Sequence, residues 1–207
     1  MPFSSVRRAT RQALAWPAGP TLSGLALGAI LAIGPAVVPA AQAAVCRVPG
    51  TYTTIQDAVN DVTCTRIQVA AGTYPGTYAI TRSMTLLGAG PARTILDGEN
   101  RGGSVVMIAP GVTVTITGVT IKGGNSDFGG GIYNQGTCTV ENSTFTANTA
   151  RTRGGGIFHN TGTLTVHNST FTANTAESGG GIYNQGSVTL TRVTFQGNSL
   201  PECAGCP

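Results

Sequence analysis

GGGIYN at residues 129–134 recurs as GGGIFH at 154–159 and again as GGGIYN at 179–184, and this threefold repeat decides the fold. Each copy continues through a short apolar segment into a Phe-x-x-Asn sequence, at residues 145–148, 171–174 and 195–198. The middle copy has one extra residue, in the turn at 160–162, and a length change confined to a turn preserves the strand register. The repeat is therefore structural, and each copy corresponds to one unit of a stack.

Two strand-like segments follow each glycine triplet. The first alternates apolar and polar residues, as in a strand with one buried face, and it lies at 138–140, 164–166 and 188–190. The second segment carries Phe145, Phe171 and Phe195. Between the two segments stand Asn142, Asn168 and Arg192, at a position where asparagine readily takes the left-handed conformation of a tight bend.

Repeats of this kind predict an all-β parallel β-helix. One coil alone cannot bury its apolar face, whereas stacking puts Phe on Phe and Asn on Asn and builds a continuous core. Helical repeats are excluded because these copies are rich in Gly and Thr, which are unfavourable in helix interiors. Less regular segments between residues 67 and 121 extend the stack, which gives about six coils over residues 67–199.

Residues 1–43 have the pattern of an export signal. Arg7, Arg8 and Arg11 precede an apolar run at 22–33, and Ala-Gln-Ala at 41–43 is a small-residue cleavage site. A membrane anchor is the alternative, but glycines interrupt the apolar run and it is short for a span. We expect a signal peptide, so that the mature protein is secreted or displayed at the bacterial outer surface, with no membrane span.

Removing the signal changes the charge balance. The chain has 12 basic and 8 acidic residues; three of the basic residues and none of the acidic ones lie in residues 1–43. The remaining chain has nine basic and eight acidic residues, a net charge of +1. Arg151 and Arg153 then indicate a solvated loop, and no basic patch supports nucleic-acid binding.

Residues 44–66 predict an N-terminal cap with one short helix. Either Thr53 or Thr54 is a suitable N-cap for a helix that places Ile55, Ala58 and Val59 on one face. Such a helix would cover the open end of the first coil, whose unpaired backbone would otherwise invite aggregation.

The cysteines fit an oxidising compartment. We expect Cys46 and Cys64, which flank the predicted helix, to form a disulfide, with two separate thiols as the alternative. Residues 200–207 form a tail in which Cys203 and Cys206 are expected to close a small disulfide loop rather than half of a zinc or redox site. Cys138 matches Leu and Val in the other copies, so it is expected to be a buried thiol.

Two known groups of β-helix proteins are similar to this chain. The repeats GGGI and FxxN resemble those of chlamydial polymorphic outer membrane proteins and related bacterial surface proteins. The earlier part resembles the N-terminal region of pectate-lyase-like and pectin-methylesterase-like proteins, in residues 54–56, 67–74, 86–88 and 94–98. The resemblance implies a single-stranded right-handed parallel β-helix. It leaves function open, because this scaffold hosts enzymes, adhesins and passive stalks.

An enzyme of the pectate-lyase-like group would need clustered carboxylates. Those lyases hold Ca²⁺ with several aspartates beside an arginine. The acids of the exported chain do not cluster on adjacent coils: Asp57, Asp61, Asp97, Glu99, Asp127, Glu141, Glu177 and Glu202. Asp97 and Glu99 are the only close pair, and Asp97-Gly98 is first a turn signal. We therefore predict no catalytic residues and no cofactor.

Metal-ligand and histidine chemistry is also weakly supported. Asp127 beside Asn125 is one acid, which cannot supply the six to eight oxygens of a Ca²⁺ site, so we predict no metal site. His159 replaces the asparagine of its neighbours in the column and is expected to be a hydrogen-bonding substitute. His167 stands in the column of Glu141, and neither histidine has a nucleophile placed for it.

The predicted ligand-binding residues in the repeats are Tyr133, Phe158 and Tyr183, which follow isoleucines that we expect to point inward. Strand alternation turns these three rings outward into an exposed strip that suits a polysaccharide or a host or cell-surface protein; shielding of the sheet is the alternative. We therefore expect a structural and adhesive surface module, with a pectate-lyase-like enzyme or its degenerate relative as the second hypothesis.

Overall fold

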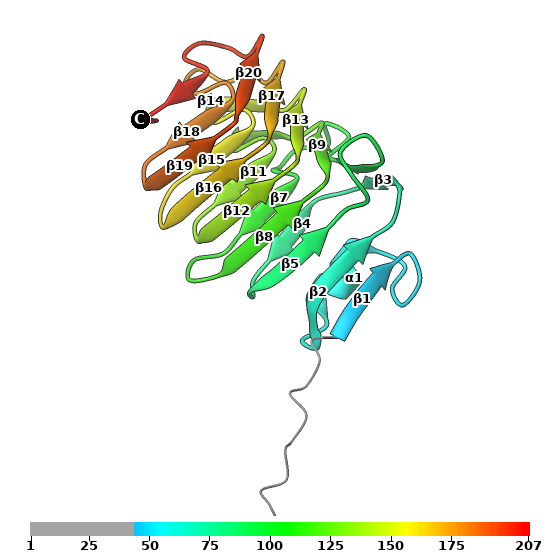
Figure 1. The fold of residues 1–207 in the computed structure, drawn as a ribbon. Helices are drawn as coiled ribbons and strands as arrows, with labels where there is room; N and C mark the ends of the chain where they lie inside the picture. The colour runs from blue at the N-terminus through cyan, green and yellow to red at the C-terminus, as the bar shows by residue number, and fades with distance from the viewer. Residues whose placement is uncertain (1–43) are drawn as a thin grey trace, which may run out of the picture. The chain divides into compact units, whose positions relative to one another are not determined.

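The computed structural model describes residues 44–207, so the predicted signal peptide lies outside the described residues. The chain winds through three sheets whose strands all pair in parallel, each with the equivalent strand of the next coil (Figure 1). We call them sheets A, B and C, in the order in which each coil visits them. The predicted all-β parallel β-helix is therefore confirmed. No helix among residues 44–207 is long and apolar enough to cross a membrane.

The strands of each sheet are given in chain order. Sheet A consists of β1 (Ala44–Val48), β2 (Cys64–Val69), β5 (Met84–Leu87), β8 (Thr113–Thr117), β12 (Thr137–Glu141), β16 (Thr163–His167) and β19 (Ser187–Thr191). Sheet B consists of β3 (Gly72–Pro75), β6 (Thr94–Asp97), β9 (Thr120–Lys122), β13 (Thr144–Thr146), β17 (Thr170–Thr172) and β20 (Thr194–Gln196). Sheet C consists of β4 (Tyr78–Ile80), β7 (Val106–Ile108), β11 (Ile132–Asn134), β15 (Ile157–His159), β18 (Ile182–Asn184) and β21 (Cys203–Ala204).

Two further elements complete the fold. A side sheet pairs β10 (Asn125–Phe128) with β14 (Thr149–Arg153), in the segments that connect sheet B to sheet C. The helix α1 (Ile55–Asn60) connects β1 and β2. Because sheet A has seven strands, the solenoid has about seven turns rather than the six expected, and the sheet begins at Ala44 rather than at residue 67.

The core is built from columns of equivalent side chains. Phe145, Phe171 and Phe195 form the predicted stack, with ring centroids 4.6 Å and 5.2 Å apart. Phe145 and Phe171 are completely buried, whereas Phe195 in the last coil is partly exposed. The alternating residues of sheet A face the same interior. Burial of these continuous apolar columns is the main stabilising contribution in a fold that has almost no helix.

Asparagines form a second, polar column inside the solenoid. The side-chain amide of Asn148 donates to Oδ1 of Asn174, and that of Asn174 donates to Oδ1 of Asn198, both at 2.9 Å. The same Oδ1 atoms also accept backbone N–H groups of the preceding coil. Glu202 accepts the last amide at 3.3 Å and so ends the ladder. These side chains satisfy backbone groups that burial would otherwise leave unpaired.

The bends between sheets A and B explain the polar residues at their corners. Asn142, Asn168 and Arg192 have φ of 46°, 52° and 53°, which confirms the predicted left-handed conformation. The glycine triplets are required for another reason, the close approach of neighbouring coils. A Cβ atom on Gly131 would lie 2.5 Å from the carbonyl oxygen of Gly156, so any larger residue would push the coils apart.

The helix α1 stabilises the N-terminal end as predicted. Thr54 is its N-cap and accepts the backbone N–H of Asp57. Ile55, Ala58 and Val59 are buried in the core cluster. Both predicted disulfides are present; the Cα atoms of Cys46 and Cys64 are 5.6 Å apart, and those of Cys203 and Cys206 are 5.8 Å apart.

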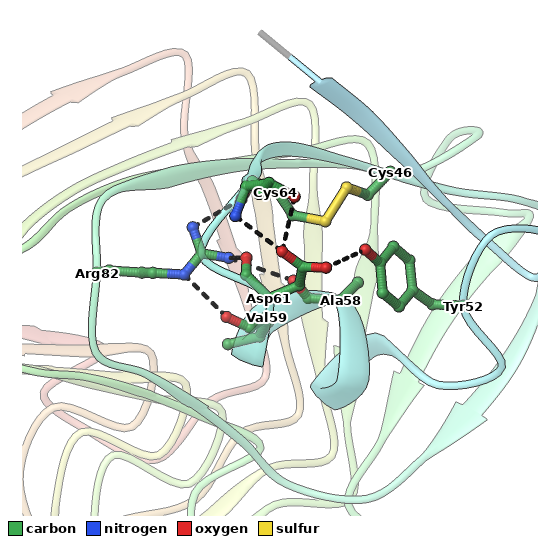
Figure 2. Close-up of a disulfide and its surroundings, with 8 residues drawn as sticks. Cys46, Tyr52, Ala58, Val59, Asp61, Cys64 and Arg82 are labelled. Atoms are coloured by element: carbon green, nitrogen blue, oxygen red, sulfur yellow. Dashed lines mark hydrogen bonds between the residues drawn. A yellow bond between two sulfur atoms is a disulfide. The ribbon is translucent and has the colours of Figure 1, made fainter.

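Arg82 holds the C-terminal end of α1 against the first coil (Figure 2). Its guanidinium donates to the carbonyl oxygens of Val59 at 3.0 Å and Cys64 at 2.7 Å, and also to those of Ala58 and Asp61. These include last-turn carbonyls that lack a partner within the helix. Hydrogen bonds from Thr63 and Tyr52 lower the pKa of the Asp61 carboxyl to about 2.

Replacing Arg82 with alanine is expected to lower the free energy of unfolding by about 2–4 kcal/mol, because several charge-assisted hydrogen bonds are lost together. Urea melts of a protein that comprises residues 44–207 would measure the loss. Arg66→Ala is the matched control, since Arg66 is an exposed arginine of β2. Equal and small losses for the two variants would contradict the role of Arg82.

Candidate functional site

The outer face of sheet C carries the predicted aromatic column. In each strand the middle residue points away from the core, because the residues before and after it face inward. The registers align Met107, Tyr133, Phe158 and Tyr183 on successive coils. The rings of Tyr133 and Phe158 are stacked with centroids 5.5 Å apart, and those of Phe158 and Tyr183 are tilted at 5.7 Å.

Phe158 does not belong to an exposed strip, contrary to the expectation from strand alternation. Only 4% of this residue is accessible to solvent. The ring of Phe128, at the end of β10, lies against it with a centroid distance of 5.2 Å. Strand alternation correctly gave the direction of the Phe158 side chain, but the side sheet supplies a ring that covers it. Tyr133 and Tyr183 are partly exposed.

The side sheet presents charged residues beside this face. Asp127 pairs with Arg151, with 3.1 Å between carboxylate oxygen and guanidinium nitrogen. The guanidinium carbon of Arg153 lies 4.9 Å from the centroid of the Tyr183 ring, which is a cation–π geometry. Both arginines are exposed, as expected, but they belong to β14 rather than to a loop.

Two exposed apolar side chains, Phe128 and Met107, flank Tyr133. They are 41% and 44% exposed. We call Met107, Phe128 and Tyr133 the aromatic surface. A cavity of about 300 Å³ lies among these three residues, Ser104, Ser126 and Asp127, and a second of about 190 Å³ shares Met107 and Tyr133 and continues toward Pro110. Most ligand pockets combine such apolar walls with a few polar groups.

Beyond Phe128 the side sheet borders a third hollow of about 510 Å³. Its lining is more polar and consists of Phe128, Thr152, Arg153, Glu177 and Ser178. Sequence reasoning singled out the ring column but missed Phe128 and Met107. The register with Tyr133 would have found Met107, whereas β10 reads NSDF and has no apolar alternation that would have placed Phe128.

His159 substitutes for asparagine, as predicted. It is buried on β15, and its Nδ1 lies 2.8 Å from Nδ2 of Asn134, so the imidazole accepts the amide hydrogen there. A Cβ atom on Gly186 would lie 2.6 Å from Nε2 of His159, so the next coil leaves room for the larger ring. Burial lowers the pKa of His159, and backbone groups of Gly162 and Ser187 oppose part of this shift.

This pKa shift predicts a pH dependence of stability. The imidazolium is disfavoured in the folded state, so protonation favours unfolding. Stability is fully present above the unfolded pKa of about 6.5 and falls as the pH decreases below it. We expect His159→Asn to remove this slope in urea melts between pH 7.5 and pH 5, and His167→Asn to retain it, because that variant keeps His159. Identical slopes for wild type and His159→Asn would contradict the assignment.

Three acidic residues, Asp97, Glu99 and Asp127, form ion pairs with neighbouring cations. Asp97 pairs with Lys122 at 3.1 Å and also accepts the backbone N–H of Glu99, as its turn position suggested. Glu99 pairs with Arg101 at 2.8 Å. Within residues 44–207, no three His, Cys, Asp or Glu residues gather in a way that could hold a metal ion. Cys138 is buried as predicted, and burial raises its pKa to about 12.

Comparison with known proteins identifies the scaffold. The family model described as "Right handed beta helix region" matches residues 61–206. No curated protein and no solved structure matches the chain. The matched range covers β2 through β21, and so includes the phenylalanine and asparagine columns of the core and the aromatic column on the outer face of sheet C. The chain belongs to the right-handed β-helix family.

Proposed function

We propose that the protein is an exported surface module that binds a polysaccharide through the aromatic surface. The observation that carries this proposal is the pair of exposed apolar side chains, Met107 and Phe128, beside Tyr133 and over two cavities. Exposed apolar patches with a polar rim are typical of binding sites. Here Ser126 and Asp127 supply the polar rim.

The chemistry favours a sugar chain over other ligands of similar size. Flat rings stack on the apolar faces of pyranose rings. At the rim, a serine hydroxyl can donate to or accept from sugar hydroxyls, and a carboxylate accepts hydrogen bonds from them. The face is also repetitive, because sheet C places one outward side chain per coil at about 4.8 Å intervals. A repetitive face suits a repetitive ligand.

Export and display are supported by residues 1–43, whose arginines, apolar run and Ala-Gln-Ala sequence match the pattern of a signal peptide. The likeness of the GGGI and FxxN repeats to bacterial surface proteins supports the same compartment. The two disulfides agree with an oxidising environment.

A glycan array probed with the purified exported chain tests the proposal. We expect binding to one class of polysaccharide, and a loss of about tenfold or more in affinity for Phe128→Ala and Met107→Ala. Phe128→Tyr keeps the ring and should retain binding. Val62→Ala is the control, because Val62 is another exposed apolar residue, at 79%, and lines neither of the two cavities.

Four outcomes would contradict the proposal. Wild type that binds no glycan, or Phe128→Ala that binds as well as wild type with unchanged thermal stability, excludes the aromatic surface as a sugar site. Adhesion to cells that survives enzymatic deglycosylation would indicate a protein partner. Release of unsaturated products from polygalacturonate would favour the pectate-lyase-like enzyme instead.

A further inference from the structure

The two ends of the solenoid differ in how well the core is covered. β19 and β20 are the outermost strands of sheets A and B at one end, and β1 is the outermost strand of sheet A at the other (Figure 1). At the β1 end, Cys46 and Val48 are buried, and α1 adds its apolar face to the same cluster. At the β19 end, Val188 and Leu190 remain partly exposed. Their equivalents one coil inward are fully buried, namely Leu164 and Val166.

The last coil also carries apolar residues where a solvent-facing end would favour polar ones. Ser143 and Ser169 occupy one column of the inner coils, and Ser169 Oγ accepts the backbone N–H of Ser143 at 3.2 Å. The last coil has Val193 in this column, and the tail that follows exposes 79% of Leu200. Terminal repeats of solenoids normally have a polar outer face. This end therefore has the composition of a covered surface.

The backbone of β19 offers hydrogen-bonding groups at its outer edge. The N–H of Ser187 donates to Gly162 at 3.1 Å, and the carbonyl of Thr191 accepts from Asn168 at 3.0 Å, so both point to the inner neighbour. Alternate residues of a strand direct their backbone groups to opposite sides. Val188 and Leu190 therefore direct theirs outward, where no strand of the described residues pairs with them.

We infer that two copies of the chain associate through their β19 strands, antiparallel, about a two-fold axis at Thr189. The strand reads Ser-Val-Thr-Leu-Thr, so this axis places Val188 opposite Leu190 and Ser187 opposite Thr191. Val188 and Leu190, whose backbone groups point outward, then exchange both hydrogen bonds with each other across the interface. Sheet A continues into the second copy with its apolar face on the same side.

Charge and closure also agree with a second copy. The two Arg192 residues would lie roughly 20 Å apart, six residue rises of about 3.3 Å, which exceeds the screening length of about 8 Å at physiological salt. An isologous pair is closed, whereas stacking of β19 on the β1 end would be open and would produce fibres. The β1 end has its core residues already buried, so it offers little apolar area for such stacking.

A cysteine at the axis gives the sharpest test. Directly opposed residues in a non-hydrogen-bonded antiparallel pair have Cα atoms about 4.5 Å apart, within the range of a disulfide. The exposed Thr189 is such a position. We expect Thr189→Cys to form a covalent dimer under mild oxidation, seen on a non-reducing gel. Ser187→Cys is the matched control, because its two copies would lie roughly 13 Å apart and should not link.

Charge substitutions at the same position test the association without a new bond. Thr189→Lys and Thr189→Asp place like charges opposite each other, and each should weaken the dimer about tenfold or more in sedimentation equilibrium. Mixing the two variants should restore it. Thr139→Lys, on the same outer face two coils inward, should dimerise as wild type does. Wild type that stays monomeric as its concentration rises, or that forms fibres, would overturn the inference. So would a Ser187→Cys variant that forms as much covalent dimer as Thr189→Cys.

Discussion

Replacing Phe171 with alanine is expected to lower the free energy of unfolding by about 3–5 kcal/mol, the usual cost of deleting a fully buried phenylalanine. Phe171 is completely buried between two other rings, with centroids 4.6 Å and 5.2 Å away. The surrounding coils cannot collapse into the cavity, because backbone ladders on three sides hold them at a fixed spacing. Urea melts followed by circular dichroism would measure the loss.

Phe195→Ala is the matched control for this prediction. Phe195 occupies the same column in the last coil, but its ring is partly exposed. Its truncation removes less buried apolar area than that of Phe171, so the free energy of unfolding should fall by only about 1–3 kcal/mol. Equal losses for the two variants, or a loss near zero for Phe171→Ala, would show that the column is not the core.

Replacing Asn174 with alanine is expected to cost about 3–5 kcal/mol, for a different reason. Its amide donates to Asn198 and to the carbonyl of Phe145, and its Oδ1 accepts two hydrogen bonds from Asn148. Removing the side chain leaves several buried polar groups of two neighbouring coils unpaired, and each such group costs about 1–3 kcal/mol.

Asn168→Gly provides the comparison, since Asn168 is an exposed asparagine of the same coil with φ of 52°, a conformation that glycine adopts freely. Its stability should change by less than about 1 kcal/mol. Denaturant melts in which Asn174→Ala is as stable as Asn168→Gly would show that the buried ladder contributes nothing.

Much of the architecture could be predicted because each repeat carries its structural signals within its own short sequence. The spacing of GGGI and FxxN fixes the register of neighbouring coils, and once the register is fixed, Phe171 must lie on Phe145 and Asn174 on Asn148. The left-handed bend at Asn168 and the N-cap at Thr54 depend on single residue types whose preferences are strong. Each of these features is decided within one coil or between adjacent coils.

The aromatic surface was harder to predict because it depends on the side sheet. β10 and β14 read NSDF and TARTR, and they pair through the backbone without an apolar alternation. Nothing local therefore indicated that Phe128 would cover Phe158, or that the exposed apolar group would be Phe128. The additional turn was missed for a similar reason. β1 and β2 are separated by a helix, so their sequences do not repeat the pattern of the later coils.

Native-state hydrogen exchange of residues 44–207 tests the central claim, that the coils stack in register around continuous core columns. The account predicts that the backbone amides of β12 and β16 exchange most slowly, and only through global unfolding. Each of these strands pairs with a neighbour on both edges, and each carries a fully buried core residue, Val140 or Val166. The tail after β20 should exchange fastest. Exchange of the β12 and β16 amides at the rate of this tail would contradict the account.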